Sequence, residues 1–520
     1  MLIARNDSWT LESGGSQVLH LPESEEKTIR LNDNLYCFYV SDELNENGLP
    51  QNGALWEDGE YRGKGTCSFF DAVFGRSESG VVLIPDSETQ AWIFRRDNDA
   101  LTLTLSGGKG CLQSYPGNEP DWTHHPFPFR NLPDAAPEVR HACIRGLLDF
   151  FAGTRRASDG TVFQSPNTSI GKGYGGDGIP DTFFQFIAAY PYLSERRRAW
   201  FRSQIEWLGG HMRFDGCIPW GGCNSLPYYH LWKRPDCGLF FDGNGLWLEM
   251  IRRIFLADGI APDPEKVVHA AGFYLQYLTE DGLVAAESKK KGCEWADLLR
   301  NGWHSSLVNV IAYRGLRAAE SILSRLEMHE LSDRYGRAAA RLKKSFNRPV
   351  SEGGFSMDTG FIDWRDKDGT VHPHWRIDTN MLAIVWGIAS PEQSRRIIHE
   401  FKRVYFRNEP AVPAPYLLYG SWMEPVDDML EGCRTFGCGR ASMPGRMGGT
   451  AVAALRMCGE NEAAEHLFKK LVQLVNHEPS VWEYYSLDGK GEGQRSYIEH
   501  SLSPLLPLHF PVEPDSIPGD

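Results

Sequence analysis

The sequence predicts a mainly α-helical protein in which a toroid of six helical hairpins follows an N-terminal antiparallel β domain. Two observations support this fold class. Up to about residue 132 the chain has almost no helical periodicity and consists of short alternating runs. From residue 133 to residue 520, amphipathic segments recur, and long loops alternate with tight ones. We therefore expect two domains, 1–132 and 133–520.

The first domain is expected to consist of antiparallel strands. Its alternating runs are LYCFYV (35–40), GVVLIP (80–85), QAWIFR (90–95) and ALTLTLSG (100–107), and Gly, Asn and Asp residues separate them. The stretch 115–134 has no periodic pattern and is rich in proline. It is predicted to be the linker to the helical domain.

About a dozen helices are expected after the linker. Their predicted ranges are 136–152, 180–192, 194–209, 237–257, 263–279, 303–324, 328–346, 377–389, 391–404, 424–434, 445–458 and 460–477. No short sequence period recurs, which disfavours a solenoid of tetratricopeptide or HEAT type.

The loops between these helices are unequal in length. Long loops are predicted at 153–179, 210–236, 280–302, 347–376, 405–423 and 478–495, whereas those at 193, 258–262, 325–327, 390 and 459 are tight. Six long loops that alternate with tight ones fit a ring of helical hairpins. Because the loops at one end of such a ring converge on its axis, functional residues should fall in the long loops.

Composition excludes several classes of protein. The net charge of −14 argues against a nucleic-acid partner, and no apolar run is long enough to span a membrane. The N-terminus lacks the apolar core of a secretory signal, and the eleven cysteines form no dense framework, so we expect a cytoplasmic protein with reduced thiols. The 16 Trp, 19 Tyr and 27 Phe residues favour a ligand on which flat rings can stack, such as a sugar.

Two of the long loops place carboxylates beside aromatic residues. They are GCEWADLLRNGW (292–303) and SVWEYYSLDG (480–489). Hydrolysis of a glycosidic bond needs one carboxylic acid to protonate the leaving oxygen and a second carboxylate to activate water or to attack directly. An aromatic wall helps an acid to stay protonated near neutral pH, and Asp297 and Glu483 could both have such a wall.

The first of these loops also has a purely structural interpretation. Carboxylates that precede a helix favour its positive end, so Glu294 and Asp297 could cap the helix predicted to begin near Gly302. From the residues alone, both interpretations remain open.

The order of five segments carries a resemblance to a known group of enzymes. The segments are EWADLLRNG, SLVNVIAYRGLRAAESI, DTNMLAIVWGIAS, MPGRMGGTAVAALRMCGENEAAEHLFKKLV and WEYYSLDGKGEGQRSYIEHS. In this order they resemble the six-hairpin (α/α)6-barrel glycosidases. That clan includes trehalase, processing α-glucosidase I, the glucosylglycerate and mannosylglycerate hydrolases, and the amylo-α-1,6-glucosidase domain of glycogen debranching enzyme. The resemblance covers residues 136–505.

The resemblance implies roles for particular carboxylates. The general acid of the clan, an Asp in a tryptophan-containing loop, matches Asp297. The general base, a Glu in an aromatic loop near the C-terminus, matches Glu483. Glu294 competes for the first role, and Glu492 and Glu499 compete for the second.

The resemblance also implies an activity, which is inverting hydrolysis by an exo-acting glycosidase on α-linked glucosides or small oligosaccharides. No cofactor is implied. The acid loop departs from the pattern, because it reads EWADLL where the small hydrolases have a longer glycine-rich version. The segment RPDCGLFFDGNGLWLEMI (234–251) resembles a debranching-type segment in which an Asp precedes a pocket-lining helix, so Asp236 or Asp242 is a substrate-binding candidate.

Other long-loop residues are candidates for sugar subsites, because rings stack on sugar faces and polar groups bind hydroxyls. We select Trp220, Tyr229, Trp295, Trp303, Trp375, Arg376, Trp482 and Tyr484. Also possible are Asp177, Tyr228, Trp232, Trp364, Asp378 and Trp422. For Asp378, a cap on the next helix, together with Thr379 and Asn380, is the structural alternative.

Other classes are weighed against a glycosidase. The histidines and cysteines form no CxxC pair with matching ligands and no HExxH helix, so no metal is predicted; the nearest clusters are His124, His125, His372 and His374, and Cys217, Cys223 and Cys237. A lyase or sugar epimerase on an α/α toroid would use His, Tyr and Lys groups such as those of LPYYHLWKR (226–234). A non-catalytic carbohydrate-binding protein would need neither Asp297 nor Glu483. Fold alone does not choose among these functions.

Overall fold

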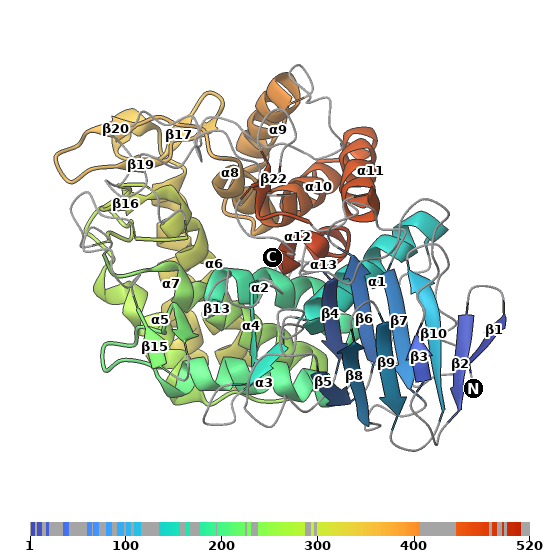
Figure 1. Ribbon diagram of the computed structural model, residues 1–520. Helices are drawn as coiled ribbons and strands as arrows, with labels where there is room; N and C mark the ends of the chain where they lie inside the picture. The colour runs from blue at the N-terminus through green and yellow to red at the C-terminus, as the bar shows by residue number, and fades with distance from the viewer. Residues whose placement is uncertain are drawn as a thin grey trace.

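The computed structural model describes ten strands between Leu2 and Tyr115 and much of the chain after residue 134 (Figure 1). The described ranges of this second part are 135–152, 154–156, 162–166, 177–193, 195–223, 226–229, 238–286, 293–295, 299–405, 444–477, 481–485, 491–492 and 497–510.

The ten strands of the N-terminal part pair only in antiparallel fashion. They form a six-stranded sheet in the order β1-β2-β10-β7-β6-β4 and a four-stranded sheet in the order β3-β9-β8-β5. Figure 1 shows both sheets on one side of the molecule, beside the first helix. The strands are β1 (Leu2–Arg5), β2 (Ser8–Glu12), β3 (Gln17–Leu19), β4 (Leu35–Val40), β5 (Glu60–Lys64), β6 (Thr66–Asp71), β7 (Gly80–Pro85), β8 (Ala91–Asp97), β9 (Ala100–Leu105) and β10 (Lys109–Tyr115). The four alternating runs that predict strands correspond to β4, β7, β8 and β9.

The second part is mainly helical. Its helices are α1 (Pro137–Ala152), α2 (Ile179–Ala189), α3 (Glu195–Gly210), α4 (Asp242–Asp258), α5 (Pro264–Gln276), α6 (Ser306–Arg325), α7 (His329–Phe346), α8 (Ile377–Val385), α9 (Pro391–Tyr405), α10 (Thr450–Met457), α11 (Asn461–His477), α12 (Ile498–Ser501) and α13 (Leu506–His509). A π-helical segment, η10 (Pro444–Gly449), leads directly into α10. The predicted helix 424–434 lies outside the described residues.

Helices α1 to α12 pack in two layers. The even-numbered helices contact one another in sequence, from α2 through α4, α6 and α8 to α10, and α12 contacts both η10 and α2. The odd-numbered helices lie outside this inner ring, each against at least one even-numbered neighbour. The burial of the side chains follows the same division, because every residue of α2 and α8 is buried, whereas α7 buries one stripe that contains Tyr335, Ala338, Leu342 and Phe346.

The connections of the ring alternate in length as predicted. Each long connection runs from an outer helix to the next inner helix, and each tight one runs from an inner helix to the next outer helix. The long connections contain short antiparallel strands. Three two-stranded sheets each lie within one connection: β11 (Thr154–Arg156) with β12 (Val162–Gln164), β17 (Ser356–Met357) with β18 (Gly360–Phe361), and β21 (Tyr484–Tyr485) with β22 (Gly491–Glu492). Two three-stranded sheets each join two connections: β13 (Asp177–Gly178), β14 (Gly221–Cys223) and β15 (Leu226–Tyr228), and β16 (His304–Ser305), β19 (Trp364–Arg365) and β20 (Val371–His372). All inner helices therefore begin at the end of the ring where the long loops lie.

Helix α4 begins later than its periodicity predicts, at Asp242 instead of residue 237. The residues just before it are held in an extended form by tertiary hydrogen bonds, because Phe240 N donates to Tyr229 O (3.2 Å) and Phe241 N donates to Cys293 O (2.9 Å). These long-range bonds override local helical preference. They also place the first turn of α4 beside the loop that carries Glu294.

The inner helices α4 and α6 approach closely where two glycines face each other. A Cβ on Gly315 would lie 2.7 Å from the Cα of Gly245, and a Cβ on Gly245 would meet the carbonyl of Ile311. Glycine is required here because the two backbones leave no room for a side chain. Among the described helices, none is long and apolar enough to cross a membrane.

We predict opposite effects for two Gly→Ala substitutions in helix interiors. Gly315→Ala should destabilise the fold by about 1–3 kcal/mol, because the methyl group forces α4 and α6 apart. Gly272→Ala in α5 is the matched control, since only the Tyr335 hydroxyl lies within 4 Å of its Cβ, at 3.9 Å. That change should stabilise by up to about 1 kcal/mol through helix propensity. Thermal unfolding of both variants checks the pair, and equal effects would contradict the close approach.

Candidate active site

Carboxylates occupy the first turns of four inner helices. They are Asp181 in α2, Asp242 in α4, Asp378 in α8 and Glu499 in α12, and all four are buried. The first turn of a helix presents unpaired N–H groups and the positive end of the helix dipole, which favour a negative charge. Because all the inner helices begin at one end of the ring, these groups converge on the same region.

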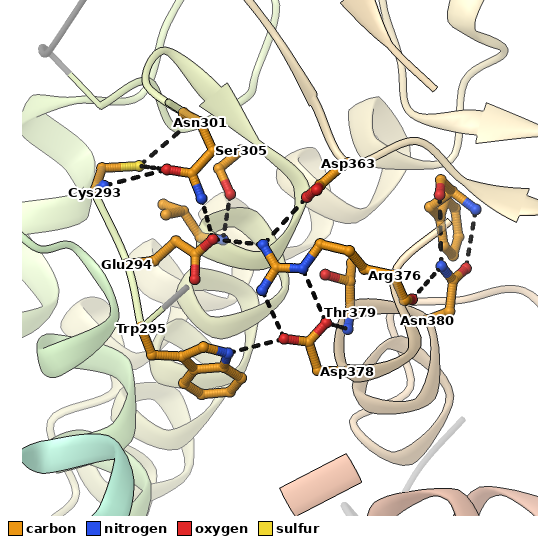
Figure 2. A network of polar contacts seen from close by, with 12 residues as sticks. Cys293, Glu294, Trp295, Asn301, Ser305, Asp363, Arg376, Asp378, Thr379 and Asn380 are labelled. Carbon is orange, nitrogen blue, oxygen red and sulfur yellow. Dashed lines mark hydrogen bonds and ion pairs between the residues drawn. The ribbon is translucent and has the colours of Figure 1, made fainter. Parts of the chain in front are cut away.

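Arg376, the N-cap residue of α8, balances three of the carboxylates in this region (Figure 2). Its guanidinium donates to Glu294 Oε1 (2.6 Å), to Asp363 Oδ1 (3.2 Å) and to both oxygens of Asp378 (3.0 and 2.6 Å). The arginine and its three partners are each at most 1% exposed. Burial lowers the pKa of Arg376, but the surrounding carboxylates raise it well above its ordinary value. The residue therefore stays charged, and it is the centre of the network in Figure 2.

Trp295 and Asp378 tie the loop before α6 to helix α8. The Trp295 indole N–H donates to Asp378 Oδ2 at 2.9 Å, and the backbone N–H of Thr379 donates to Asp378 Oδ1 at 2.8 Å. Burial raises the pKa of Asp378, but the charge and hydrogen bonds of Arg376 hold it below its ordinary value. The prediction that Asp378 caps α8 is wrong, since the N-cap is Arg376 and Asp378 lies inside the first turn.

Glu294 is not a helix cap. Helix α6 begins at Ser306, and its cap is the Ser305 hydroxyl, which accepts a hydrogen bond from Val308 N. Glu294 instead binds Arg376 and accepts a hydrogen bond from the Asn301 side chain. The structural alternative for the first loop is therefore excluded for Glu294.

Among the four first-turn carboxylates, Asp242 is the one that no arginine of the described residues neutralises. It is fully buried, and its carboxyl group lies close to the Trp220 indole. Burial raises the pKa of Asp242 to about 8, and the negative charge of Glu294 adds to the rise, whereas the Trp220 indole opposes it. Asp242 is thus protonated at neutral pH and carries a proton that it can donate.

A second buried arginine, Arg446 in η10, forms ion pairs with Asp181 and Glu499. Its side chain donates to both oxygens of Glu499, at 2.6–3.1 Å, and to Asp181 Oδ1 at 2.8 Å. The Tyr497 hydroxyl also donates to Asp181. Burial raises the pKa of Asp181, and the Arg446 charge opposes that rise. Glu499 is therefore committed to an ion pair, which weakens its candidacy as the general base.

The loop that carries Glu483 is attached to helix α12. Val481 O accepts a hydrogen bond from Tyr497 N (2.9 Å), and Trp482 O accepts one from the His500 ring (2.9 Å). Since a carbonyl only accepts, the hydrogen lies on His500 Nδ1, and burial lowers the pKa of His500 to about 3, which keeps the ring neutral. Glu483 itself is half-buried.

The remaining predicted site residues fall into two groups. Trp220 stacks on Phe240 with ring centres 4.5 Å apart and lies close to Asp242. Trp303 is half-buried, has a φ of 87° and packs under the Lys367 ammonium at 4.6 Å. A positive φ is strained for so bulky a residue.

By contrast, several candidates have structural contacts. The Tyr229 hydroxyl donates to His211 O, and the Trp375 indole donates to Thr359 O at 2.9 Å. Asp177 holds the strand pair β13–β14 together, because its side chain accepts a hydrogen bond from Gly222 N (2.7 Å).

Some predictions fall outside what the structure describes. These are Asp236, Asp297, Trp232 and Trp422, together with the side chains of Tyr484 and Glu492. Within the described ranges, no three His, Cys, Asp or Glu residues are grouped so as to hold a metal ion. His372 stacks on Trp364 and forms a hydrogen bond with Asp366 (3.0 Å).

Four residues of this region are not among those predicted from the sequence: Asp181, Asn301, Asp363 and Arg446. One signal was present for Asp181, because DGIPD, FFDGN and WRIDT each place an Asp at or just inside a helix start that follows a glycine-rich or aromatic loop. Arg446 had no such signal, since its partners lie 265 and 53 residues away.

Comparison with known proteins adds to this geometry. The sequence matches no protein-family model and no curated protein. Among solved structures, a GH78 family rhamnosidase of Bacillus sp. GL1 superposes with a TM-score of 0.52 at 13% identity, over 96% of this chain and 44% of that one. A bacterial glucoamylase complexed with acarbose gives a TM-score of 0.50 at 11% identity, over 85% and 79% of the two chains. A glycosidase variant in complex with glucose gives 0.50 at 10% identity, over 72% and 96%.

The chain has the six-hairpin fold of these glycosidases. This agrees with the resemblance seen in the sequence, and it accounts for the mainly helical ring. The chain spans less than half the length of the rhamnosidase. At these identities the likeness concerns the fold, and the chemistry has to be argued from the residues.

We predict that Asp242 makes the folded state less stable as the pH rises above 3.8. Below pH 3.8 both the folded and the unfolded chain hold its proton. Between pH 3.8 and about 8 only the folded chain holds it, so the stability that Asp242 contributes is lost as the pH rises, at about 1.4 kcal/mol per pH unit. Asp242→Asn should therefore raise the unfolding temperature at pH 8 more than at pH 5. An equal shift at both pH values would contradict a protonated Asp242.

Removal of the Arg376 charge should destabilise the fold less at acidic pH than at neutral pH, whereas a mere loss of packing would be independent of pH. Arg376→Gln leaves three buried carboxylates uncompensated and should cost about 3–5 kcal/mol at pH 7. Without the arginine, the pKa values of these carboxylates rise in the folded state, so part of the stability should return as the pH falls toward 5. Arg314→Gln is the matched control, because its partner Glu249 keeps Arg252 and Arg253. Denaturant titrations at both pH values should show a smaller loss in the control.

Proposed function

We propose that the protein is an inverting glycoside hydrolase that acts on the chain end of α-linked glucosides or small oligosaccharides, with Asp297 as general acid and Glu483 as general base. One observation carries the proposal. Trp295, two residues before Asp297, packs against Arg446. The loop 481–485, which carries Glu483, bonds to Tyr497 and His500, the neighbours of the Arg446 partner Glu499. Two carboxylates on loops joined in this way suit the single displacement of an inverting glycosidase.

The surroundings of Asp242 suit a sugar. Asp242 is a protonated carboxyl next to the indole of Trp220, which gives a hydrogen-bond donor beside a flat ring. Acarbose and glucose are the ligands of two proteins of similar fold. These ligands favour an α-linked glucoside as the substrate class.

The lyase or epimerase alternative has less support. The tyrosines that such an enzyme could use, Tyr228 and Tyr229, donate hydrogen bonds from their hydroxyls to the backbone carbonyls of Asp177 and His211. A general base must be free to accept a proton from the substrate, and these hydroxyls are engaged. Exchange of solvent deuterium into a ring carbon would favour that alternative, whereas solvent oxygen at the anomeric carbon would favour the hydrolase.

The mechanism predicts different losses for the two carboxylates. A panel of aryl α-glycosides and disaccharides first identifies a substrate. Asp297→Asn should then lower kcat by about 10²–10⁴-fold for poor leaving groups and much less for glycosyl fluorides, because these need little protonation. Glu483→Gln should lower kcat by a similar factor for both kinds of substrate. Glu330→Gln, an exposed residue of α7, is the control and should retain full activity.

The stereochemistry tests the same mechanism independently. Proton NMR of the first sugar released should show the inverted anomer. Retention would overturn the assignment of Glu483 as a base and make it a nucleophile. Losses of only a few-fold in either variant would exclude the substituted residue from the chemistry.

A further inference from the structure

Arg446 contacts helix α12, helix α2 and the loop before α6. Its backbone N–H and its guanidinium both donate to Glu499 in α12, with the backbone bond at 2.7 Å, and the guanidinium also donates to Asp181 in α2. All three side chains are buried. A planar guanidinium can hold two carboxylates at once in fixed directions, whereas the ammonium of a lysine cannot.

The same guanidinium lies against the aromatic residues of the acid loop. Its central carbon is 5.3 Å from the ring centre of Trp295 and 5.4 Å from that of Phe184, and these two rings meet edge to face with centres 5.6 Å apart. A cation over an aromatic ring is attracted to it, most strongly away from water. Arg446 therefore helps to fix the position of Trp295.

Through Glu499, the arginine also reaches the loop that carries Glu483. Tyr497, two positions before Glu499, donates its backbone N–H to Val481 O. The ring of His500, directly after Glu499, donates to Trp482 O. Trp482 N in turn donates to the Tyr485 hydroxyl at 2.9 Å. The backbone immediately before Glu483 is thus attached to the helix that Arg446 anchors.

We propose that Arg446 is a positioning residue, which sets the two loops of the proposed acid and base relative to each other without touching the substrate. This inference rests on the proposed function of Asp297 and Glu483. Because a displacement of about 1 Å can cost a catalytic step about 10²-fold, a small change in how Arg446 holds its partners should lower kcat strongly. Binding of the sugar should change much less, so KM should remain within a few-fold of wild type.

The test compares Arg446→Lys with Arg314→Lys. Arg314 is also buried and donates to both oxygens of one glutamate, Glu249, but that ion pair links α4 and α6 only. Both variants keep the charge and should lose some thermal stability. Arg446→Lys should lower kcat by about 10²-fold, and Arg314→Lys should leave kcat at the wild-type value. Wild-type kcat in folded Arg446→Lys would overturn the proposal.

A second measurement is independent of activity. Full-length protein labelled with 5-fluorotryptophan gives fluorine NMR signals for Trp295 and Trp482, assigned from their Phe variants. Arg446→Lys should shift both signals and Arg314→Lys neither, whereas a shift of Trp295 alone would contradict a link to the base loop. If Arg446→Lys does not fold, Glu499→Gln carries the test, because a weakened ion pair should still shift the Trp482 signal, and an unchanged signal would overturn the proposal. An inactive wild-type protein would refute the proposed function, and the fluorine spectra would still decide whether Arg446 holds the two loops.

Discussion

The inner helices of the ring all begin at one end, and this shared direction is the constraint on which the candidate site depends. Each helix start exposes N–H groups and a partial positive charge, so a carboxylate in the first turn is favoured there. Four of the described inner helices have such a carboxylate. Burial of several like charges together would be prohibitive without cations. Arg376 and Arg446 supply them from the same end of the ring.

Asp242 differs from the other three carboxylates because no described cation reaches it. Burial and the negative charge of Glu294 leave it protonated at neutral pH. A neutral carboxyl can donate a hydrogen bond, which an ionised one cannot. Natural active sites often keep groups in environments that cost stability, and Asp242 has this character. Trp295, by contrast, is fixed by Asp378 at its N–H and by Arg446 at its ring, so the acid loop is anchored to two different helices.

Much of the fold could be predicted from the sequence because helical periodicity is local. The strands β4 and β7 and the helices α3, α7 and α11 have the expected positions within one or two residues, and the alternation of loop lengths gives the ring. The start of α4 could not be predicted, since backbone bonds to Tyr229 and Cys293 decide it. The bounds of the short helix α12 could not be predicted, because four residues carry too little periodicity. For the site, residue types near tryptophans were informative, but the pairing of Arg446 with Asp181 and Glu499 depends on long-range contacts that no local pattern encodes.

The π-helical turn before α10 makes the direction of Arg446 tolerant of a one-residue change in chain length. A π-helix accommodates an additional residue per turn, and η10 runs without a break into α10. Loss of one residue from η10 would allow the turn to relax into an α-helix, and because a π-helix turns less per residue, the residues on either side would keep nearly the same relative directions. Arg446 would then keep its direction toward α2 and α12, and α10 itself would be unchanged. Loss of one residue from this turn is therefore a change in chain length that the arginine contact could survive without any substitution of Arg446.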